Sequence, residues 1–488
     1  MTLRHRFGLG LASLSGVLVL GVLGAVPACS SDDGSATVAP IPPAIPPAPE
    51  AGPPGPEVDA GPPKVIPKPT FPEVQSRGGP VIKTPRIVPI VFAGDPLIAQ
   101  ITQFTAKIAT SEYWKTVGAE YGVGAITPLE TIVLDEAAPE AITSDQIEAW
   151  LAAKLSGETP ALGAPDADTL YAVYYPASTK ITMGDGDDRL GQSCEGYGGY
   201  HFEIAAGGKQ VGYTVLPRCS DIDELTVAAS HEYFEWATDP FPKTKPAYSK
   251  LDEPHWAWQA TMIGELGDLC TFLDRENLHP PDIGFEVQRQ WSNKLSLAGK
   301  YPCAPAKTTP YLQAITTTID DALVPDYGSI SRYVKTKAIR VPPGQTKKVD
   351  VLIYSDQAGS QLVPLRAMSY QQFYAGTGEK TGFVFTLDQT HGKVGETVEI
   401  SIKAPKEPGY DLLMMLAYTS KTAAHYWPVL VINDDGSEVG AGRPSVPTFP
   451  TRPRASRDGE RAATSPIGIR ALRPVTKLGM GRRLPPSP

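Results

Sequence analysis

Residues 228–240, with the sequence AASHEYFEWATDP, hold a histidine and two glutamates at spacings that suit metal chemistry. His231 and Glu235 are four positions apart, so a helix places both side chains on one face, where they can bind one ion. Glu232 takes the position that the general base holds in the HExxH zinc peptidases. Zinc accepts imidazole nitrogen and carboxylate oxygen. The segment therefore predicts a zinc site, with calcium or manganese as alternatives because carboxylates suit harder ions.

A catalytic zinc needs a third protein ligand besides these two. Glu265 and Asp268, in the later segment GELGDLC, are predicted to offer one. His201 and His255 are competitors, although a histidine next to tryptophans, such as His255, is more often a packing residue. Asp239 is expected to cap the end of the helix and to set the following turn. The alternative to a metal site is a network of hydrogen-bonded carboxyl groups, because unpaired buried carboxylates are costly.

The elements that must position these residues form an α+β region over residues 78–305. Thr143 and Gln146 have the spacing of a capping box, and the helix with the motif is expected to begin at Ser220 or Asp221. A mixed sheet followed by a helix that carries the motif is the order of a zincin-like fold. Three strands, a hairpin and two helices are expected in the segments RIVPIVFAG, LETIVLDE, TLYAVYYPAS, YHFEIAAGGKQVGYTVLP, DPLIAQITQFTAKIATSEYWKTVGAEYG and TSDQIEAWLAAKLSG.

A second folded region is predicted over residues 330–435, after a linker at 306–329. Val349, Val351 and Ile353 alternate with polar residues, and further short alternating strands follow. This spacing is typical of an immunoglobulin-like β-sandwich. The region contains no catalytic cluster, so we expect an accessory module.

The two ends of the chain read as targeting and spacer segments. Residues 1–28 have basic residues before an apolar run, which is typical of a secretory signal, and Cys29 follows as the lipidated residue of a lipoprotein. An ordinary cleaved signal peptide is the alternative. Residues 29–77 are rich in proline, alanine and glycine and predict a semi-rigid stalk. Residues 436–488 predict a disordered basic tail. Serine rather than aspartate after Cys29 favours an outer-membrane lipoprotein that faces the periplasm or the outside of the cell.

Charge and cysteine content fit an exported protein. The net charge is −9, and no basic face or motif predicts binding to nucleic acid. Four cysteines besides Cys29 suggest two disulfides, for which three connectivities exist. We favour Cys194–Cys219 and Cys270–Cys303, because both pairs are local and together they bracket the helix with the motif. A zinc site made of the four cysteines is the alternative, but no CxxC spacing supports it.

Three segments, SHEYFEWATDP, GELGDLC and VQRQWSNKLSLAGKYPC, occur in one order and resemble bacterial relatives of the phosphate-induced protein, or Exordium-like, secreted family. The resemblance covers about residues 80–303. It implies an extracellular protein, and its bacterial relatives that keep the His-Glu pair look like metallopeptidases. The matching positions are His231, Glu232, Glu235, Asp239, Glu265, Asp268 and Cys270.

The sequence thus predicts a surface-anchored lipoprotein with a zinc-dependent hydrolase domain that acts on a peptide or cell-surface substrate. His231, Glu235 and either Glu265 or Asp268 would hold the metal, and Glu232 would be the general base. The alternative is a non-catalytic extracellular binding protein, in which the same residues form a structural metal site or a hydrogen-bond network.

Overall fold

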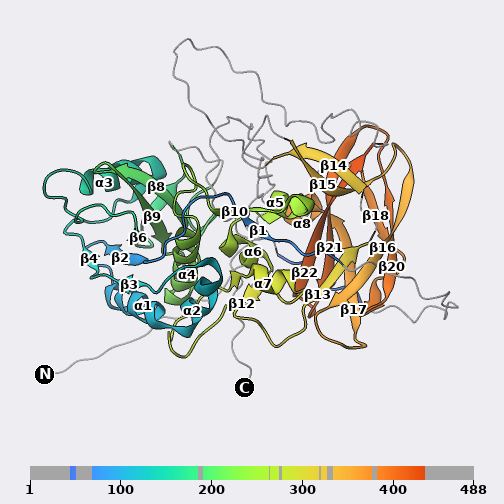
Figure 1. The fold of residues 1–488 in the computed structure, drawn as a ribbon, viewed down its shortest axis with the longest axis horizontal. Helices are drawn as coiled ribbons and strands as arrows, with labels where there is room; N and C mark the ends of the chain where they lie inside the picture. Colours follow the sequence, from blue (N-terminus) through green and yellow to red (C-terminus); the bar gives the residue numbers. More distant parts are fainter. Residues whose placement is uncertain are drawn as a thin grey trace, which may run out of the picture. The chain divides into compact units, whose positions relative to one another are not determined.

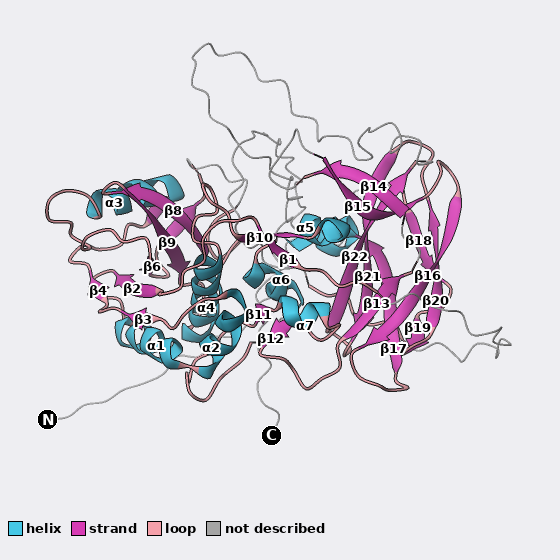
Figure 2. Cartoon of the chain, viewed as in Figure 1, coloured by secondary structure: helices cyan, strands magenta, loops and turns pink. Residues whose placement is uncertain are grey.

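The computed structural model describes residues 44–50, 69–184, 191–262, 264–273, 277–317, 320–326, 333–375 and 382–434. These residues form an α+β structure in which strands outnumber helices (Figure 2). The predictions of a signal peptide, a lipidated Cys29 and a basic tail lie outside the described residues. No helix among the described residues has the length and apolar composition that crossing a membrane requires.

A mixed sheet forms the centre of the first region (Figure 1). Its strands are β2 (Arg86–Val91), β3 (Thr127–Pro128), β4 (Ile132–Val133), β6 (Thr169–Tyr175), β8 (Tyr200–Ala206) and β9 (Lys209–Pro217). The order is β3-β2-β6-β9-β8, and β4 also pairs with β2. All pairs are parallel except the antiparallel pair of β8 and β9. Gly207 and Gly208 both have positive φ, which allows the tight turn of this predicted hairpin.

Helices cover both faces of this sheet, as the nearly continuous apolar runs of β2 and β6 require. α1 (Ile98–Thr110) and α4 (Ile222–Thr238) share a hydrophobic core with one face, and α2 (Glu112–Gly118) packs beside α1. α3 (Ser144–Lys154) shares a core with the other face. Gly212 of β9 lets α4 lie close to the sheet, because a Cβ atom there would overlap the indole of Trp236.

Local signals predicted the starts of α3 and α4 correctly. Thr143 and Gln146 form the capping box of α3, and the Asp221 side chain accepts a hydrogen bond from the Glu224 amide at the start of α4. The helix expected across residues 95–122 is divided at Ser111, whose hydroxyl accepts from the Trp114 amide and so begins α2. The expected strand LETIVLDE is reduced to the two residues of β4.

The second region contains two sheets, as its alternating strands predicted. One sheet has the order β13 (Leu312–Thr316), β16 (Thr346–Ser355), β20 (Thr397–Lys403) and β18 (Val384–Leu387). The other has the order β14 (Asp320–Pro325), β15 (Tyr333–Arg340), β22 (Ala424–Asn433), β21 (Gly409–Tyr418), β17 (Leu362–Ser369) and β19 (His391–Lys393), with α8 (Tyr370–Ala375) after β17. Pairs are antiparallel except β15 with β22. Val349, Val351 and Ile353 are buried in a hydrophobic core that also includes residues of the first region.

Strand pairing begins before the predicted boundary at residue 330. β13 and β14 lie within the expected linker 306–329 and belong to the two sheets. The segment LQAIT of β13 is buried throughout, so it shows no alternation by which the sequence could have marked it.

Parts of the expected stalk also pack against the folded chain. β1 (Val74–Ser76) pairs with β10 (Tyr248–Leu251). Nearer the N-terminus, the Ala48 amide donates to the Lys421 carbonyl at 3.0 Å, and the Tyr418 hydroxyl donates to the Pro46 carbonyl at 2.7 Å. These described parts of residues 29–77 are therefore held by the body of the protein and do not act as a free spacer.

Short elements after α4 complete the first region. They are the 3-10 turn Glu253–His255, α5 (Trp256–Met262), α6 (Leu266–Leu273), α7 (Asn293–Leu297) and the pair β11 (Gln290–Trp291) and β12 (Cys303–Ala304). The turn η1 (Ala119–Tyr121) and the parallel pair β5 (Ala141–Thr143) and β7 (Lys180–Thr182) lie earlier in the chain.

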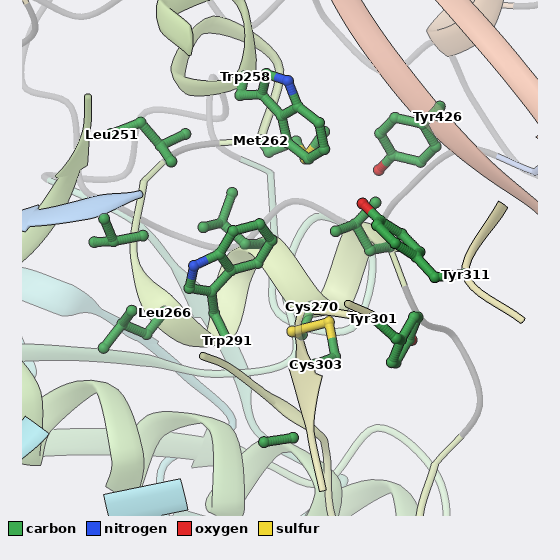
Figure 3. Close-up of a cluster of buried hydrophobic side chains, with 14 of the residues drawn as sticks. Leu251, Trp258, Met262, Leu266, Cys270, Trp291, Tyr301, Cys303, Tyr311 and Tyr426 are labelled. Carbon is green, nitrogen blue, oxygen red and sulfur yellow. A yellow bond between two sulfur atoms is a disulfide. The ribbon is translucent and has the colours of Figure 1, made fainter. Parts of the chain in front are cut away.

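Both predicted disulfides are present, Cys194–Cys219 and Cys270–Cys303. The second joins α6 to β12 within a cluster of aromatic side chains that includes Trp291, Tyr301 and Tyr311 (Figure 3). Disulfides of this kind are typical of an extracellular or periplasmic location.

Candidate metal centre

The middle of α4 carries His231, Glu232 and Glu235, all of them buried. The His231 Nε2 atom lies 3.0 Å from the Glu235 Oε2 atom, yet it has no hydrogen-bond partner among the described residues. Two ligand atoms on one tetrahedral zinc ion are about 3.4 Å apart, given bonds of about 2.1 Å. The predicted i, i+4 pair therefore has the separation of two ligands that face a common point.

α6 brings Asp268 to the same place. Its Oδ1 atom lies 3.7 Å from His231 Nε2, and its backbone amide donates to Glu235 Oε1 at 2.9 Å. That hydrogen bond fixes the Glu235 carboxylate with Oε2 toward the histidine. His231, Glu235 and Asp268 each offer a ligand atom within 4.8 Å of the others, so this group can hold a metal ion.

His201, at the start of the edge strand β8, also reaches the centre. Its Nδ1 atom lies 3.3 Å from Glu232 Oε2 and 3.7 Å from Glu235 Oε2. Together with Glu235 and Glu265 it forms a second group whose ligand atoms lie within 4.8 Å of one another. The structure thus places both predicted carboxylates, Glu265 and Asp268, at the centre, but in different groups.

Hydrogen bonds on the outer side of each imidazole orient the two rings. His231 Nδ1 lies 3.1 Å from Gln288 Oε1, which also accepts from the Thr271 hydroxyl at 2.7 Å. His201 Nε2 lies 3.3 Å from the carbonyl oxygen of Asp239. With the proton on this outer nitrogen, each ring turns a lone pair toward the carboxylates, as a metal-binding histidine does. Gln288 and Thr271 were not predicted, because nothing in the sequence marks an uncharged amide or hydroxyl group as the partner of a histidine.

The buried ionisable groups strongly shift one another's pKa values. Burial and the neighbouring carboxylates raise the pKa of Glu265 and of Asp268 well above the usual range. Burial lowers the pKa of His231, but the carboxylates around it outweigh this and raise it well above its ordinary value. Burial raises the pKa of Glu235, yet the facing imidazoles of His231 and His201 bring it below its ordinary value. Without a cation, the centre therefore retains protons that a metal would displace.

The remaining predicted residues divide into those near the centre and those outside it. Glu232 belongs to neither group, although its Oε1 atom lies 3.9 Å from His231 Nε2. Asp239 shapes the turn after α4, as predicted: its amide donates to the Glu235 carbonyl, and its Oδ1 accepts from the Ala247 amide at 2.6 Å. His255 lies away from the centre and contacts Asp252 Oδ2 at 2.7 Å.

All of these side chains are almost fully enclosed. Their exposed fractions range from 1% to 4%, for His201, His231, Glu232, Glu235, Glu265 and Asp268. A cavity beside α3, lined in part by Glu148, Glu203 and Lys243, includes none of them. The centre is therefore as closed to solvent as a structural metal site. The group of His231, Glu235 and Asp268 nevertheless offers three protein ligands, the number found in catalytic zinc sites.

Comparison with known proteins does not assign this chain to a family. No family model matches the chain, and no curated protein matches it. Domains 4 and 5 of the S-layer protein SbsC align at 11% identity over 27% of this chain and 80% of that one, with a TM-score of 0.15. Domains 1–6 of SbsC align at 10% identity over 27% and 17%, with a TM-score of 0.16. A beta-glucosidase from Listeria innocua aligns at 10% identity over 74% and 48%, with a TM-score of 0.13. Scores this low carry no argument about fold or function.

Proposed function

We propose that this protein is a metal-dependent hydrolase of the cell envelope that cleaves peptide bonds, with zinc as the metal. His231, Glu235 and Asp268 are the proposed ligands. The observation that carries the proposal is that three protein ligands from two elements converge beside Glu232, a carboxylate outside this ligand group. Three protein ligands leave a tetrahedral ion with one free position, which is the pattern of catalytic zinc.

The chain's own residues account for the proton transfers that hydrolysis requires. A bound divalent ion supplies a Lewis acid that polarises a carbonyl group and acidifies water. Glu232 accepts a proton from the attacking water as the new C–O bond forms. The same carboxyl then gives that proton to the amine nitrogen as the C–N bond breaks. His201 Nδ1, 3.3 Å from Glu232 Oε2, holds this carboxylate in place.

Other features support the proposal at the level of the whole chain. A mixed sheet, with its antiparallel strand β8 at the edge and α4 packed against β8 and β9, is consistent with a zincin-like domain. The two-sheet region is proposed to be an immunoglobulin-like accessory module. The resemblance to bacterial Exordium-like proteins, the two disulfides and the predicted lipidation of Cys29 together favour an outer-membrane lipoprotein with a peptide or cell-surface substrate.

The test compares wild type, His231→Ala and Glu232→Gln as full-length proteins. Zinc content is measured by mass spectrometry, and hydrolysis is measured on a peptide library. We expect His231→Ala to lose zinc. We expect Glu232→Gln to keep zinc but to lose about 10²–10⁴-fold in rate, the usual contribution of a general base. A wild-type protein without metal, or an equally active Glu232→Gln variant, would refute the hydrolase.

A second candidate is a non-catalytic binding protein with a structural metal site. The enclosure of every ligand, at 1–4% exposure, favours it. In that case Glu232→Gln would leave all properties unchanged. His231→Ala would instead lower the melting temperature, because a structural metal contributes to folding free energy.

A further inference from the structure

We infer that the centre binds two divalent metal ions and that the Glu235 carboxylate bridges them. The first position is the one proposed above, with His231 and Asp268. The second position has His201 and Glu265 as its ligands. The inference extends the proposed function and rests on its metal site, but it makes a separate claim about the number of ions.

The two groups of ligands overlap at one residue only. Among the described residues, His201 and His231 never belong to the same group. A single Glu235 atom, Oε2, lies 3.0 Å from His231 Nε2 and 3.7 Å from His201 Nδ1. Both distances are close to the separation of about 3.4 Å expected for ligands of one tetrahedral ion. One oxygen can therefore serve two neighbouring ions, as carboxylates do in centres with metals about 3.5–4 Å apart.

Glu265 gives independent evidence for a ligand at the second position. It is 1% exposed, and neither of its carboxyl oxygens accepts a hydrogen bond from a donor among the described residues. The charged groups that act on it most strongly are other carboxylates, led by Glu235. A buried carboxylate without a donor is costly, and a cation between it and His201 would remove that cost.

The orientation of His201 agrees with the same position. Its Nε2 atom faces the Asp239 carbonyl oxygen at 3.3 Å, and a carbonyl only accepts hydrogen bonds. The proton therefore belongs on Nε2, which leaves the lone pair of Nδ1 directed at Glu232 and Glu235. A lone pair that faces carboxylate oxygens is repelled unless a proton or a metal ion lies between them.

Charge balance favours two ions over one. Four buried carboxylates, those of Glu232, Glu235, Glu265 and Asp268, surround the two imidazoles. Among the ion pairs of the described residues, none joins these carboxylates to a lysine or an arginine. Two divalent ions would neutralise four carboxylates. One ion would neutralise only two of them, and the other two would have to keep protons or stay as uncompensated buried charges, which are strongly unfavourable.

The experiment counts metal ions in the full-length protein after dialysis against zinc and removal of free metal. Wild type is compared with His201→Ala, Glu265→Gln and His231→Ala, and His279→Ala serves as a control because this histidine is exposed. Glu265→Gln keeps the size of the side chain, so it tests the ligand even if His201→Ala fails to fold. The proteins are then loaded with manganese(II), and their electron paramagnetic resonance spectra are recorded.

We expect about two zinc ions per chain in wild type and in His279→Ala, and one fewer in each of the other three variants. The manganese spectrum of wild type should show coupling between two ions, and that coupling should vanish in Glu265→Gln. One zinc ion in wild type that His201→Ala and Glu265→Gln both retain would overturn the second position while leaving the proposed hydrolase standing. One zinc ion in wild type that is lost in both His201→Ala and His231→Ala would mean that the two histidines share a single site. That result would also overturn the second position. No zinc in any variant would overturn both proposals.

Discussion

At the scale of single residues, protons and metal ions compete for the same buried side chains of the centre. Its carboxylates are too crowded to ionise together in a buried site unless a cation compensates them. The metal-free protein meets this by keeping protons on Glu265 and Asp268 and on the imidazoles. A metal must displace those protons, so binding and pH are linked.

This linkage predicts opposite pH dependence of stability with and without metal. In the metal-free fold the pKa values of Glu265, Asp268, His231 and His201 are raised, so between about pH 5 and pH 8 the folded state binds more protons than the unfolded state. Stability then falls as pH rises through this window. Glu235, whose pKa is lowered, is ionised in both states there and adds no slope.

The measurement is the melting temperature at pH 5.5 and at pH 7.5, in a chelator and in excess zinc. We expect the chelated protein to melt lower at pH 7.5 than at pH 5.5. With zinc the order should reverse, because fewer protons compete for the ligands and tighter binding stabilises the fold. A common direction under both conditions would show that these groups do not control stability.

Sequence identified the ligands on one helix and named Glu265, Asp268 and His201 as further candidates, but it could not show how each of them meets that helix in space. His231, Glu232 and Glu235 follow from helical spacing alone. His201 and His255 both lie among aromatic residues, and only the pairing of β8 with β9 shows that His201 reaches α4. Gln288 carries no local signal, since its role depends on the 3.1 Å contact with His231 that the tertiary fold creates.

At the scale of elements, the centre depends on how closely α6 approaches α4. Gly267, in the first turn of α6, makes this possible. A Cβ atom at Gly267 would lie 2.7 Å from Glu235 Oε1 and 2.9 Å from His231 Nδ1, both too close for real contacts. The glycine therefore allows two ligands of α4 to sit against the backbone of α6.

We predict that Gly267→Ala weakens metal binding by at least about tenfold, or 1.4 kcal/mol, because both ligands must move. Helix propensity alone predicts the opposite trend in stability, a gain of about 1 kcal/mol for alanine over glycine. Gly198→Ala is the matched control, because a Cβ atom there meets nothing within 4 Å. Calorimetric titration with zinc measures both variants. Equal affinities would mean that the approach of α6 does not position the ligands.

The disulfides should affect the centre unequally. Cys270 lies in α6 two residues after Asp268, and its bond to Cys303 closes 33 residues, against 25 for Cys194–Cys219. Loop entropy predicts a similar loss of about 3–4 kcal/mol in unfolding free energy when either bond is removed. Only Cys270→Ala/Cys303→Ala should also release the first metal position, because that bond anchors the helix of Asp268. Metal analysis and denaturant unfolding of the two double variants test this, and equal metal loss would contradict it.

Element prediction succeeded where a side chain signals locally and failed where burial hides the signal. The capping box of Thr143 and Gln146 and the glycine pair at 207–208 are local chemistry, and both were found. Ser111 is a local signal of the same kind, because its side chain begins α2. It was missed because the apolar helical pattern continues on both sides of it. β13 was missed because a strand buried on both sides does not alternate.

At the scale of the whole molecule, the two regions share one hydrophobic core. Trp427 of β22 lies with its ring centroid 5.2 Å from that of Trp258 in α5 and 5.9 Å from that of Phe71. The Trp256 indole donates to the Pro325 carbonyl at 2.9 Å, and the Lys250 ammonium pairs with Asp326. The second region therefore packs against the segment from β10 to α6, which carries Asp268, and helps to hold it in place.

We therefore predict that the two regions unfold together and that Trp427→Ala destabilises both. Trp427 is 6% exposed, and truncation of a buried tryptophan costs about 3–5 kcal/mol. Val384→Ala is the control, because Val384 is 52% exposed in β18 and its loss should change the unfolding free energy by less than about 0.5 kcal/mol. Calorimetry should show one transition in wild type and a lower single transition, with reduced zinc affinity, in Trp427→Ala. Two separate transitions, with only the second region shifted, would mean that the second region is an independent module, and the metal centre would then have to be stable without it.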